Sequence, residues 1–235
     1  MVRAMFAPFA FAGHELALGA ARALYWPAER ALLVADLHLE KASWFAARGQ
    51  MLPPYDSRDT LERLADAVKA TGARRVITLG DNFHDDAGAL RLDPHACGML
   101  EALTRALDWV WITGNHDEAL PRGFGGTILP ELAIGGVILR HEARPGETAP
   151  ELSGHYHPKL RISVRNRNIA RPCAVFGRSA GGGDRMILPA FGSLTGGLDA
   201  GHPEILGALQ PARRIEALMP AGGKIARFPL WQAAA

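Results

Sequence analysis

Runs of apolar residues recur along the first half of the chain, and stretches with helical spacing separate them. Three runs are almost wholly apolar, as is typical of strands buried on both faces of a sheet: 31–35, 75–79 and 109–113. Residues 59–71 and 94–107 carry apolar side chains at helical spacing, and Gly72 ends the first of these helices. The early part of the chain therefore alternates strand and helix.

The pattern changes after residue 126. Short apolar runs at 132–134 and 137–139 are separated by pairs of glycines, which predicts hairpins. One more strand is predicted over 15–24. Because strands and helices alternate early and strands crowd together late, we expect an α/β protein with a second, more antiparallel sheet. No repeat or low-complexity linker divides the sequence, which favours one domain over residues 1–235.

Composition narrows the class of protein. With 48% hydrophobic and 21% charged residues, the chain is neither disordered, nor a coiled coil, nor a collagen-like repeat. A net charge of +2 is too small to indicate nucleic-acid binding by itself. The two cysteines have no C-x-x-C spacing, so we expect a reducing compartment and a cytoplasmic location. No apolar run is long enough to predict a membrane span.

Polar motifs follow the predicted strands. The three early strands run into Asp-Leu-His at 36–38, Gly-Asp-Asn at 80–82 and Gly-Asn-His-Asp at 114–117. The late strands run into His141 and into Gly-His-Tyr-His at 154–157. Sites in open α/β sheets form at the carboxyl ends of strands. Five such motifs in order therefore predict one convergent site.

Together these motifs resemble the calcineurin-like metallophosphoesterases, whose pattern is D-x-H, G-D, G-N-H-[DE], a lone H and G-H-x-H. The chain departs from a common extension, G-D-x-x-D, because His84 stands three positions after Asp81. The resemblance implies a four-layer α-β-β-α sandwich of two mixed sheets flanked by helices. It also implies two divalent ions bridged by Asp81, one held with Asp36, His38 and His157 and the other with Asn115, His141 and His155.

Four further segments, 36–41, 79–84, 154–158 and 188–192, are similar to the small bacterial ligase-associated DNA-damage-response endonucleases. This likeness covers roughly residues 14–198. It implies a phosphodiesterase or endonuclease that acts on DNA in repair, in association with DNA ligase and helicase machinery.

The implied ligand set indicates its own chemistry. Mixed nitrogen and oxygen ligands without a thiolate favour Mn²⁺, Fe or Zn²⁺ over copper, and four imidazoles argue against Mg²⁺ or Ca²⁺ alone. Mn²⁺ is the ion that we favour. Two divalent ions would leave a residual positive charge for a phosphate and would supply a bridging hydroxide as the nucleophile. His116 is interpreted as the residue that meets the phosphate or protonates the leaving oxygen, with Asp117 orienting it.

Further residues are candidates for substrate binding. Lys41 and His84 follow metal motifs, although a solvated lysine and a structural histidine are the common alternatives. Trp44 and Phe45 would either line a wall for bases or pack in the core. Residues 158–178 contain six basic and no acidic residues. As one strand, this stretch would place four cations on one face, either to bind nucleic acid or as a charged, solvated edge: Lys159, Arg161, Arg165 and Arg167.

The sequence thus predicts a dimetal phosphodiesterase that acts on DNA. A phosphomonoesterase or nucleotide hydrolase is the second hypothesis. A scaffold that has lost its chemistry is the third, and the intact set of ligand residues argues against it.

Overall fold

The computed structural model describes residues 6–117, 123–164, 167–179, 181 and 183–234. Its first sheet has seven strands that follow chain order, antiparallel from β1 to β4 and parallel from β4 to β7. The three almost wholly apolar runs form its parallel strands β4, β5 and β6, which are buried along most of their length. The strands are β1 (Phe6–Phe11), β2 (His14–Gly19), β3 (Leu24–Trp26), β4 (Ala31–Val34), β5 (Arg75–Leu79), β6 (Asp108–Ile112) and β7 (Thr127–Leu129).

The second sheet also has seven strands, in the order β16-β15-β13-β14-β10-β9-β8. β9, β10 and β14 are parallel to one another, and the other neighbouring pairs are antiparallel. The strands are β8 (Glu131–Ile134), β9 (Val137–Arg140), β10 (Glu151–Ser153), β13 (Ala174–Arg178), β14 (Arg185–Ile187), β15 (Arg214–Ala221) and β16 (Lys224–Gln232). Both sheets are therefore mixed.

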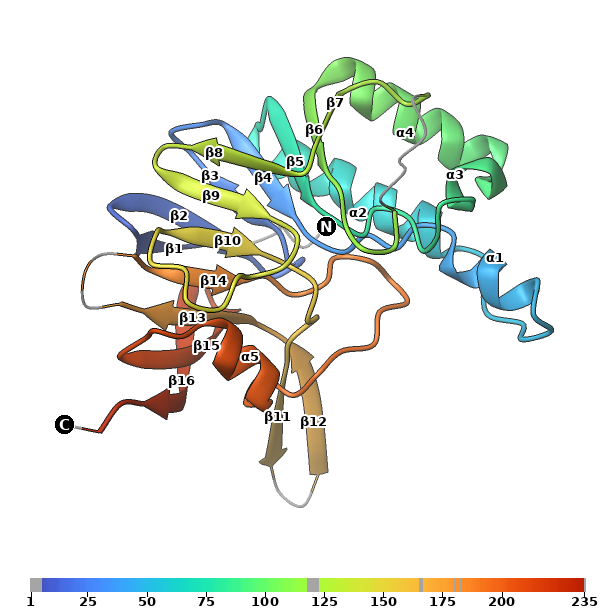
Figure 1. Ribbon diagram of the computed structural model, residues 1–235. Coiled ribbons are helices and arrows are strands. Elements are labelled where there is room, and N and C mark those ends of the chain that lie inside the picture. The colour runs from blue at the N-terminus through green and yellow to red at the C-terminus, as the bar shows by residue number, and fades with distance from the viewer. Residues whose placement is uncertain (1–5, 118–122, 165–166, 180, 182, 235) are drawn as a thin grey trace.

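Figure 1 shows the two sheets and the helices beside them. Three apolar cores hold these layers together. The first lies between the sheets and joins residues such as Trp26 and Phe176. The second joins the first sheet to α2 and α4, and the third joins the second sheet to α5. This is the predicted four-layer sandwich. The helices are α1 (Lys41–Ala46), α2 (Asp56–Thr71), α3 (Gly88–Arg91), α4 (Pro94–Ala106) and α5 (Pro203–Ala208).

Local sequence explains where the two long helices begin and end. α2 ends at Gly72, whose backbone is left-handed at φ 68°. Asp93 precedes α4, and its carboxylate accepts hydrogen bonds from the backbone N–H groups of His95 and Ala96. Both helices lie close to their predicted ranges. Among the residues that the structure describes, no helix combines the length and the apolar character that crossing a bilayer requires.

Residues 15–24 were predicted as one strand, and this prediction is wrong. β2 ends at Gly19, and β3 begins only at Leu24. A tight turn separates them, in which Arg22 has φ 72° and its N–H donates to the carbonyl of Gly19 at 2.9 Å. The apolar character of the stretch continues through the turn because Ala23 is buried there. Apolar sequence alone therefore concealed the turn.

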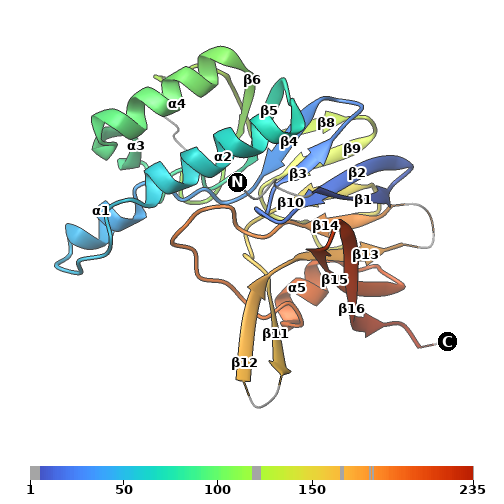
Figure 2. The same ribbon diagram turned by 180° about the vertical axis from the view of Figure 1, so that it is seen from behind.

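A two-stranded sheet stands apart from both large sheets. It consists of β11 (Lys159–Val164) and β12 (Arg167–Pro172), paired antiparallel. Figures 1 and 2 both show this hairpin projecting away from the body of the molecule. It starts two residues after His157, so its base lies beside the predicted site.

Candidate metal centre

Five strand ends bring the predicted ligands together. Those of the first sheet follow β4, β5 and β6, and those of the second follow β9 and β10. The structure forms one cluster of possible ligand atoms from Asp36, His38, Asp81 and His157, all within 4.8 Å of one another. A second cluster contains Asp81, His141 and His155 under the same limit. Because Asp81 belongs to both clusters, it is the residue that could bridge two ions.

The first cluster has the chemistry of a cation site. The Nε2 atoms of His38 and His157 lie 3.1 Å apart. Each also faces a carboxylate oxygen at 3.6 Å, Asp81 Oδ2 for His38 and Asp36 Oδ1 for His157. Carboxylates and neutral imidazoles are oxygen and nitrogen donors suited to a divalent transition ion.

In the second cluster, hydrogen-bond acceptor atoms of different residues face one another. Nδ1 of His141 donates to the carbonyl of Leu79 at 3.0 Å, which leaves a lone pair on Nε2 of the neutral ring. That Nε2 lies 2.9 Å from Oδ1 of Asn115 and 3.3 Å from Oδ1 of Asp81. Nδ1 of His155 lies 3.0 Å from the same oxygen of Asn115. Converging acceptors repel each other unless a cation lies between them, so these residues fit a metal ion.

Burial keeps two of the histidine ligands in the form that binds metal. It lowers the pKa of His38 far below its usual value, and the neighbouring His157 lowers that pKa further. Burial also lowers the pKa of His155, with His141 as the next cause. A neutral imidazole is the species that ligates a metal, so these shifts favour binding at neutral pH.

The backbone around the ligands is strained. A left-handed backbone in a residue other than glycine typically costs about 1–3 kcal/mol, and such residues cluster at functional sites. Hydrogen bonds between the turns hold this conformation, including His38 N–H to the carbonyl of Asp81 at 2.9 Å. Five of the seven predicted ligands have positive φ: Asp36 (53°), His38 (43°), Asp81 (47°), His155 (73°) and His157 (48°).

Two motif glycines are required by close approach. A Cβ on Gly114 would overlap the carboxylate of Asp81. A Cβ on Gly154 would lie only 2.7 Å from Oδ2 of Asp36. Gly114 therefore makes room for the carboxylate of Asp81, and Gly154 makes room for that of Asp36.

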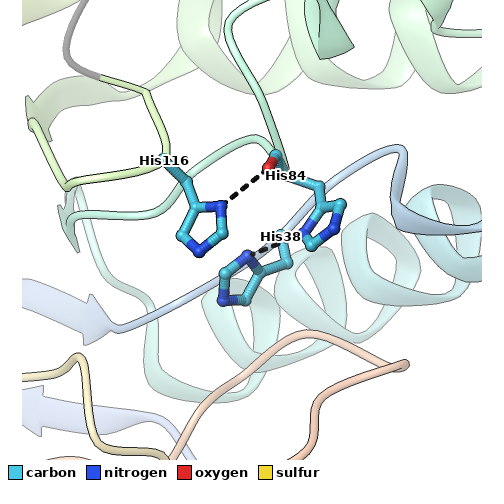
Figure 3. Close-up of side chains that lie close together, drawn as sticks. All are labelled: His38, His84 and His116. Carbon is cyan, nitrogen blue, oxygen red and sulfur yellow. Dashed lines mark hydrogen bonds between the residues drawn. The ribbon is translucent and has the colours of Figure 1, made fainter. Parts of the chain in front are cut away.

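His116 lies at the edge of the first cluster (Figure 3). Its Nδ1 lies 2.9 Å from the backbone carbonyl of His84, and its ring meets the ring of His38 edge to face with centroids 5.1 Å apart. Its backbone N–H donates to Oδ1 of Asp81 at 3.1 Å. Since Nδ1 is engaged by a carbonyl, Nε2 is the atom left for a substrate.

Asp117 does not orient the ring of His116, contrary to the sequence-based expectation. Its carboxylate is buried and accepts from the backbone N–H groups of Gly114, Asn82 and Phe83 at 2.6–3.1 Å. Burial raises the pKa of Asp117 to about 6, although those N–H groups act to lower it. Asp117 instead holds together the two turns that carry Asp81 and Asn115, and the carbonyl of His84 orients His116.

His84, where the family pattern often has aspartate, lies within the site. One possible ligand atom of each of His38, His84 and His116 falls within 4.8 Å of the others. The ring of His84 stacks on that of His116 with centroids 5.2 Å apart. Figure 3 shows these two side chains close to that of His38. Burial lowers the pKa of His84 to about 4, and the charge of Lys41 lowers it further. His84 is therefore neutral at pH 7.

Lys41 begins α1 beside the metal ligands. It is half-buried, and its charge acts to lower the pKa of both His38 and His84. Burial lowers its own pKa, while the nearby Asp56 and Asp81 act to raise it. Lys41 thus adds a cation to this edge of the centre.

The predicted basic stripe is not one strand face. β11 ends at Val164, Arg165 lies outside the described residues, and Arg167 begins β12. Arg167 pairs with Val164, so it shares a face with the even-numbered residues of β11. Arg171 pairs with Leu160 and lies on that same face. Of the described cations, only Lys159 and Arg161 keep the predicted arrangement.

One buried ion cluster was not anticipated from the sequence. Glu151, fully buried at the start of β10, accepts from Arg140 at 2.8 Å and from Arg185 at 2.7 Å. Arg140 directly precedes His141, so the ion cluster helps to fix the end of β9 from which this ligand of the second cluster extends. The available signal was a charged residue in each of three short strands: Arg140 in β9, Glu151 in β10 and Arg185 in β14.

Comparison with known proteins agrees with this geometry. The family model for the calcineurin-like phosphoesterases matches residues 29–168, more than half of the chain and the segment that carries every predicted metal ligand. The chain belongs to this family and is a metal-dependent phosphoesterase.

Among solved structures, the chain is similar to the crystal structure of the Pseudomonas putida nuclease MPE. The two are 30% identical in sequence with a TM-score of 0.70, and the match covers 95% of this chain and 100% of that one. No curated protein matches the chain.

Proposed function

We propose that this protein is a phosphodiesterase that cleaves DNA and uses two divalent ions. The observation that carries the proposal is the pair of clusters sharing Asp81, with the basic strand β11 starting two residues beyond the ligand His157. The likeness to a nuclease along nearly the whole chain supports a nucleic-acid substrate.

Two groups of residues would hold the ions. Asp36, His38 and His157 would bind one, and Asn115, His141 and His155 the other, with Asp81 shared between them. The donor set favours Mn²⁺ first, with Fe or Zn²⁺ as alternatives. Divalent ions bound there supply Lewis acidity to the phosphate and an activated water for attack on phosphorus.

His116 would donate a proton to the leaving group. Its Nδ1 faces a carbonyl, which favours a proton on that atom, and Nε2 can then give a second proton to a departing oxygen. Lys41, whose charge acts on both His38 and His84, would compensate charge on the phosphate. These roles require a substrate whose leaving group needs protonation, as a DNA strand does.

The basic face of β11 would hold the flanking polymer. Lys159 donates to the carbonyl of Thr195 at 3.0 Å, and Arg161 is exposed and 3.7 Å from Asp199. Because β11 starts two residues beyond His157, the first of these cations follows a predicted metal ligand closely along the chain. Counterion release by such cations is the main source of affinity for nucleic acid.

A phosphomonoesterase or nucleotide hydrolase is the competing function in this family. Hydrolysis of a chromogenic phosphodiester and of its monoester, compared in Mn²⁺, separates the two. We expect the diester to be hydrolysed with the higher kcat/KM, together with cleavage of a single-stranded oligonucleotide. Faster turnover of the monoester without cutting of the oligonucleotide would reject the proposal.

A role in DNA repair alongside DNA ligase and helicase machinery is proposed from the resemblance of the motifs. The free cysteines Cys97 and Cys173 support a reducing compartment, and we propose the cytoplasm. Copurification of the tagged protein from its own cells, before and after DNA damage, tests the association. Recovery of neither ligase nor helicase under both conditions would reject it.

A further inference from the structure

Three near-parallel rings lead outward from the metal centre. His116 stacks on His84 at an interplanar angle of 21°, and His84 stacks on Phe45 at 17° with centroids 6.2 Å apart. Trp44 meets the ring of His84 edge to face at 4.9 Å. The guanidinium of Arg48 lies over the ring of Trp44, 3.6 Å from its centroid. We call Trp44 and Phe45 the aromatic wall.

The wall is not part of the protein core. Trp44 and Phe45 are half-buried, and neither belongs to any of the three apolar cores formed by the described residues. They lie on α1, which projects from the body of the molecule in Figures 1 and 2. Their rings meet each other and the ring of His84. Core packing, the alternative suggested by the sequence, therefore does not account for these two rings.

The position of α1 is fixed by polar contacts. The N–H of Ala42 donates to the carboxylate of Asp56 at 3.0 Å. The N–H of Glu40 donates to the hydroxyl of Ser57 at 2.8 Å, and that hydroxyl donates back to the carboxylate of Glu40 at 2.7 Å. These buried groups anchor the first turn of α1 to the start of α2. The wall is therefore held in place without burying its rings.

We propose that the aromatic wall stacks the nucleobase of a nucleotide next to the scissile phosphate. This inference rests on the proposed function, because it requires a nucleic-acid strand at the metals. In a nucleotide, a sugar joins an anionic phosphate to an aromatic base. In the site, the ring of His84 lies between the metal centre with His116, which would bind the phosphate, and the aromatic wall, which would stack the base. Stacking on aromatic side chains accepts every base, and Arg48 beside Trp44 adds a cation near the strand.

A purely structural role for Phe45 is the alternative. In that case Phe45 would only position the ring of His84, and the identity of the substrate beyond the phosphate would not matter. The two accounts differ in whether the effect of Phe45 depends on a base. This dependence can be measured directly.

The test uses nitrophenyl phosphodiesters of thymidine, linked through its 3′ or its 5′ oxygen, and their abasic deoxyribose analogues. Nitrophenolate leaves without a proton, so the comparison is insensitive to proton transfer by His116. Kinetics are measured in Mn²⁺ with wild type, Phe45→Leu, Phe45→Tyr and Tyr55→Leu. Tyr55 is an aromatic residue, 66% exposed, that belongs to none of the stacked pairs above and serves as the matched control.

We expect the base to raise the kcat/KM of the wild type by roughly 5- to 100-fold in at least one isomer, mainly through KM. Phe45→Leu should abolish most of that base effect while leaving the abasic analogue nearly unchanged. Phe45→Tyr should keep it, and Tyr55→Leu should not alter it. Bound metal, measured for each variant, should be equal.

Two outcomes would overturn the inference. One is a wild type that hydrolyses both substrates with no base effect in either isomer. The other is equal loss on the thymidine and abasic diesters in Phe45→Leu, which would assign Phe45 to positioning His84. A wild type that cleaves neither these diesters nor an oligonucleotide would instead reject the proposed function, so the two failures are distinguishable.

Discussion

His116 is the residue whose role separates most clearly from that of the metal ligands. Its ring touches the cluster without presenting a free Nδ1 to it, since that atom faces the carbonyl of His84. His116→Ala should therefore retain bound metal but slow cleavage of DNA by about 10²-fold or more. The loss should be much smaller for a nitrophenyl diester, whose leaving group needs no proton. Equal losses on both substrates would assign His116 to charge stabilisation on the phosphate.

Asp81 is predicted to be the bridging ligand because it belongs to both clusters. Asp81→Ala should reduce the metal content of the purified protein from two ions per chain to none at Mn²⁺ concentrations that saturate the wild type. Asn115→Ala is the matched comparison, because Asn115 faces only the second cluster and its loss should spare the first ion. Elemental analysis after gel filtration gives both values. Retention of one tightly bound ion by Asp81→Ala would show that Asp81 does not bridge.

At this scale the sequence predicted which residues meet but not how they are held. The convergence of the five motifs could be predicted because they follow strands whose carboxyl ends meet, and the resemblance to the metallophosphoesterases implied which of their residues are ligands. The role of Asp117 could not be predicted, because its partners are backbone N–H groups of other turns. The left-handed backbones of five ligands leave only a weak signal in residue type, because aspartate and histidine are enriched in that conformation but adopt it at few of their positions.

The hairpin β11–β12 provides its own control for nucleic-acid binding. Lys159 and Arg161 share one face, and the pairing of the strands puts Arg167 and Arg171 on the other. Replacing Lys159 and Arg161 by alanine should flatten the dependence of log affinity on log salt by up to about 1.4 units for a single strand, at about 0.7 per lost contact. Replacing Arg167 and Arg171 should leave the slope nearly unchanged.

Affinities for an oligonucleotide at several salt concentrations, from fluorescence anisotropy, give these slopes. Hydrolysis of a small diester should change little in either pair of variants. Equal flattening by the two pairs would mean that the hairpin acts only through its total charge, which contradicts a single binding face. The sequence misled here because period-two counting continued from β11 into β12, a separate strand that pairs antiparallel with β11.

The buried ion cluster behind His141 makes a prediction about stability. Glu151→Ala leaves Arg140 and Arg185 buried without their shared partner, and loss of a buried partner typically costs about 3–5 kcal/mol. Glu62→Ala is the matched control, since it removes an exposed pair with Arg58 on α2 and should cost less than about 1 kcal/mol. Urea unfolding of the two metal-free variants gives the comparison. Equal free energies of unfolding would show that the cluster contributes no stability.

For the whole molecule, the apolar pattern predicted the α/β class, and the resemblance of the motifs predicted the four layers. Three of the four parallel strands of the first sheet, β4, β5 and β6, were found from their apolar runs, because strands buried on both faces need apolar residues throughout. The second sheet was harder to outline, because β10 and β14 have only three residues each. A strand of three residues is too short to show an alternation of apolar and polar positions. Each of the two strands also contains a buried charged residue, which interrupts the apolar pattern.

The central claim is that phosphoester hydrolysis depends on metal ions held where the two sheets meet. The most direct measurement is activity on a chromogenic phosphodiester during titration of the chelated protein with Mn²⁺. The site predicts no activity in protein whose metal content has been verified as zero, and recovery that saturates at two ions per chain. Full activity in verified metal-free protein would contradict the account.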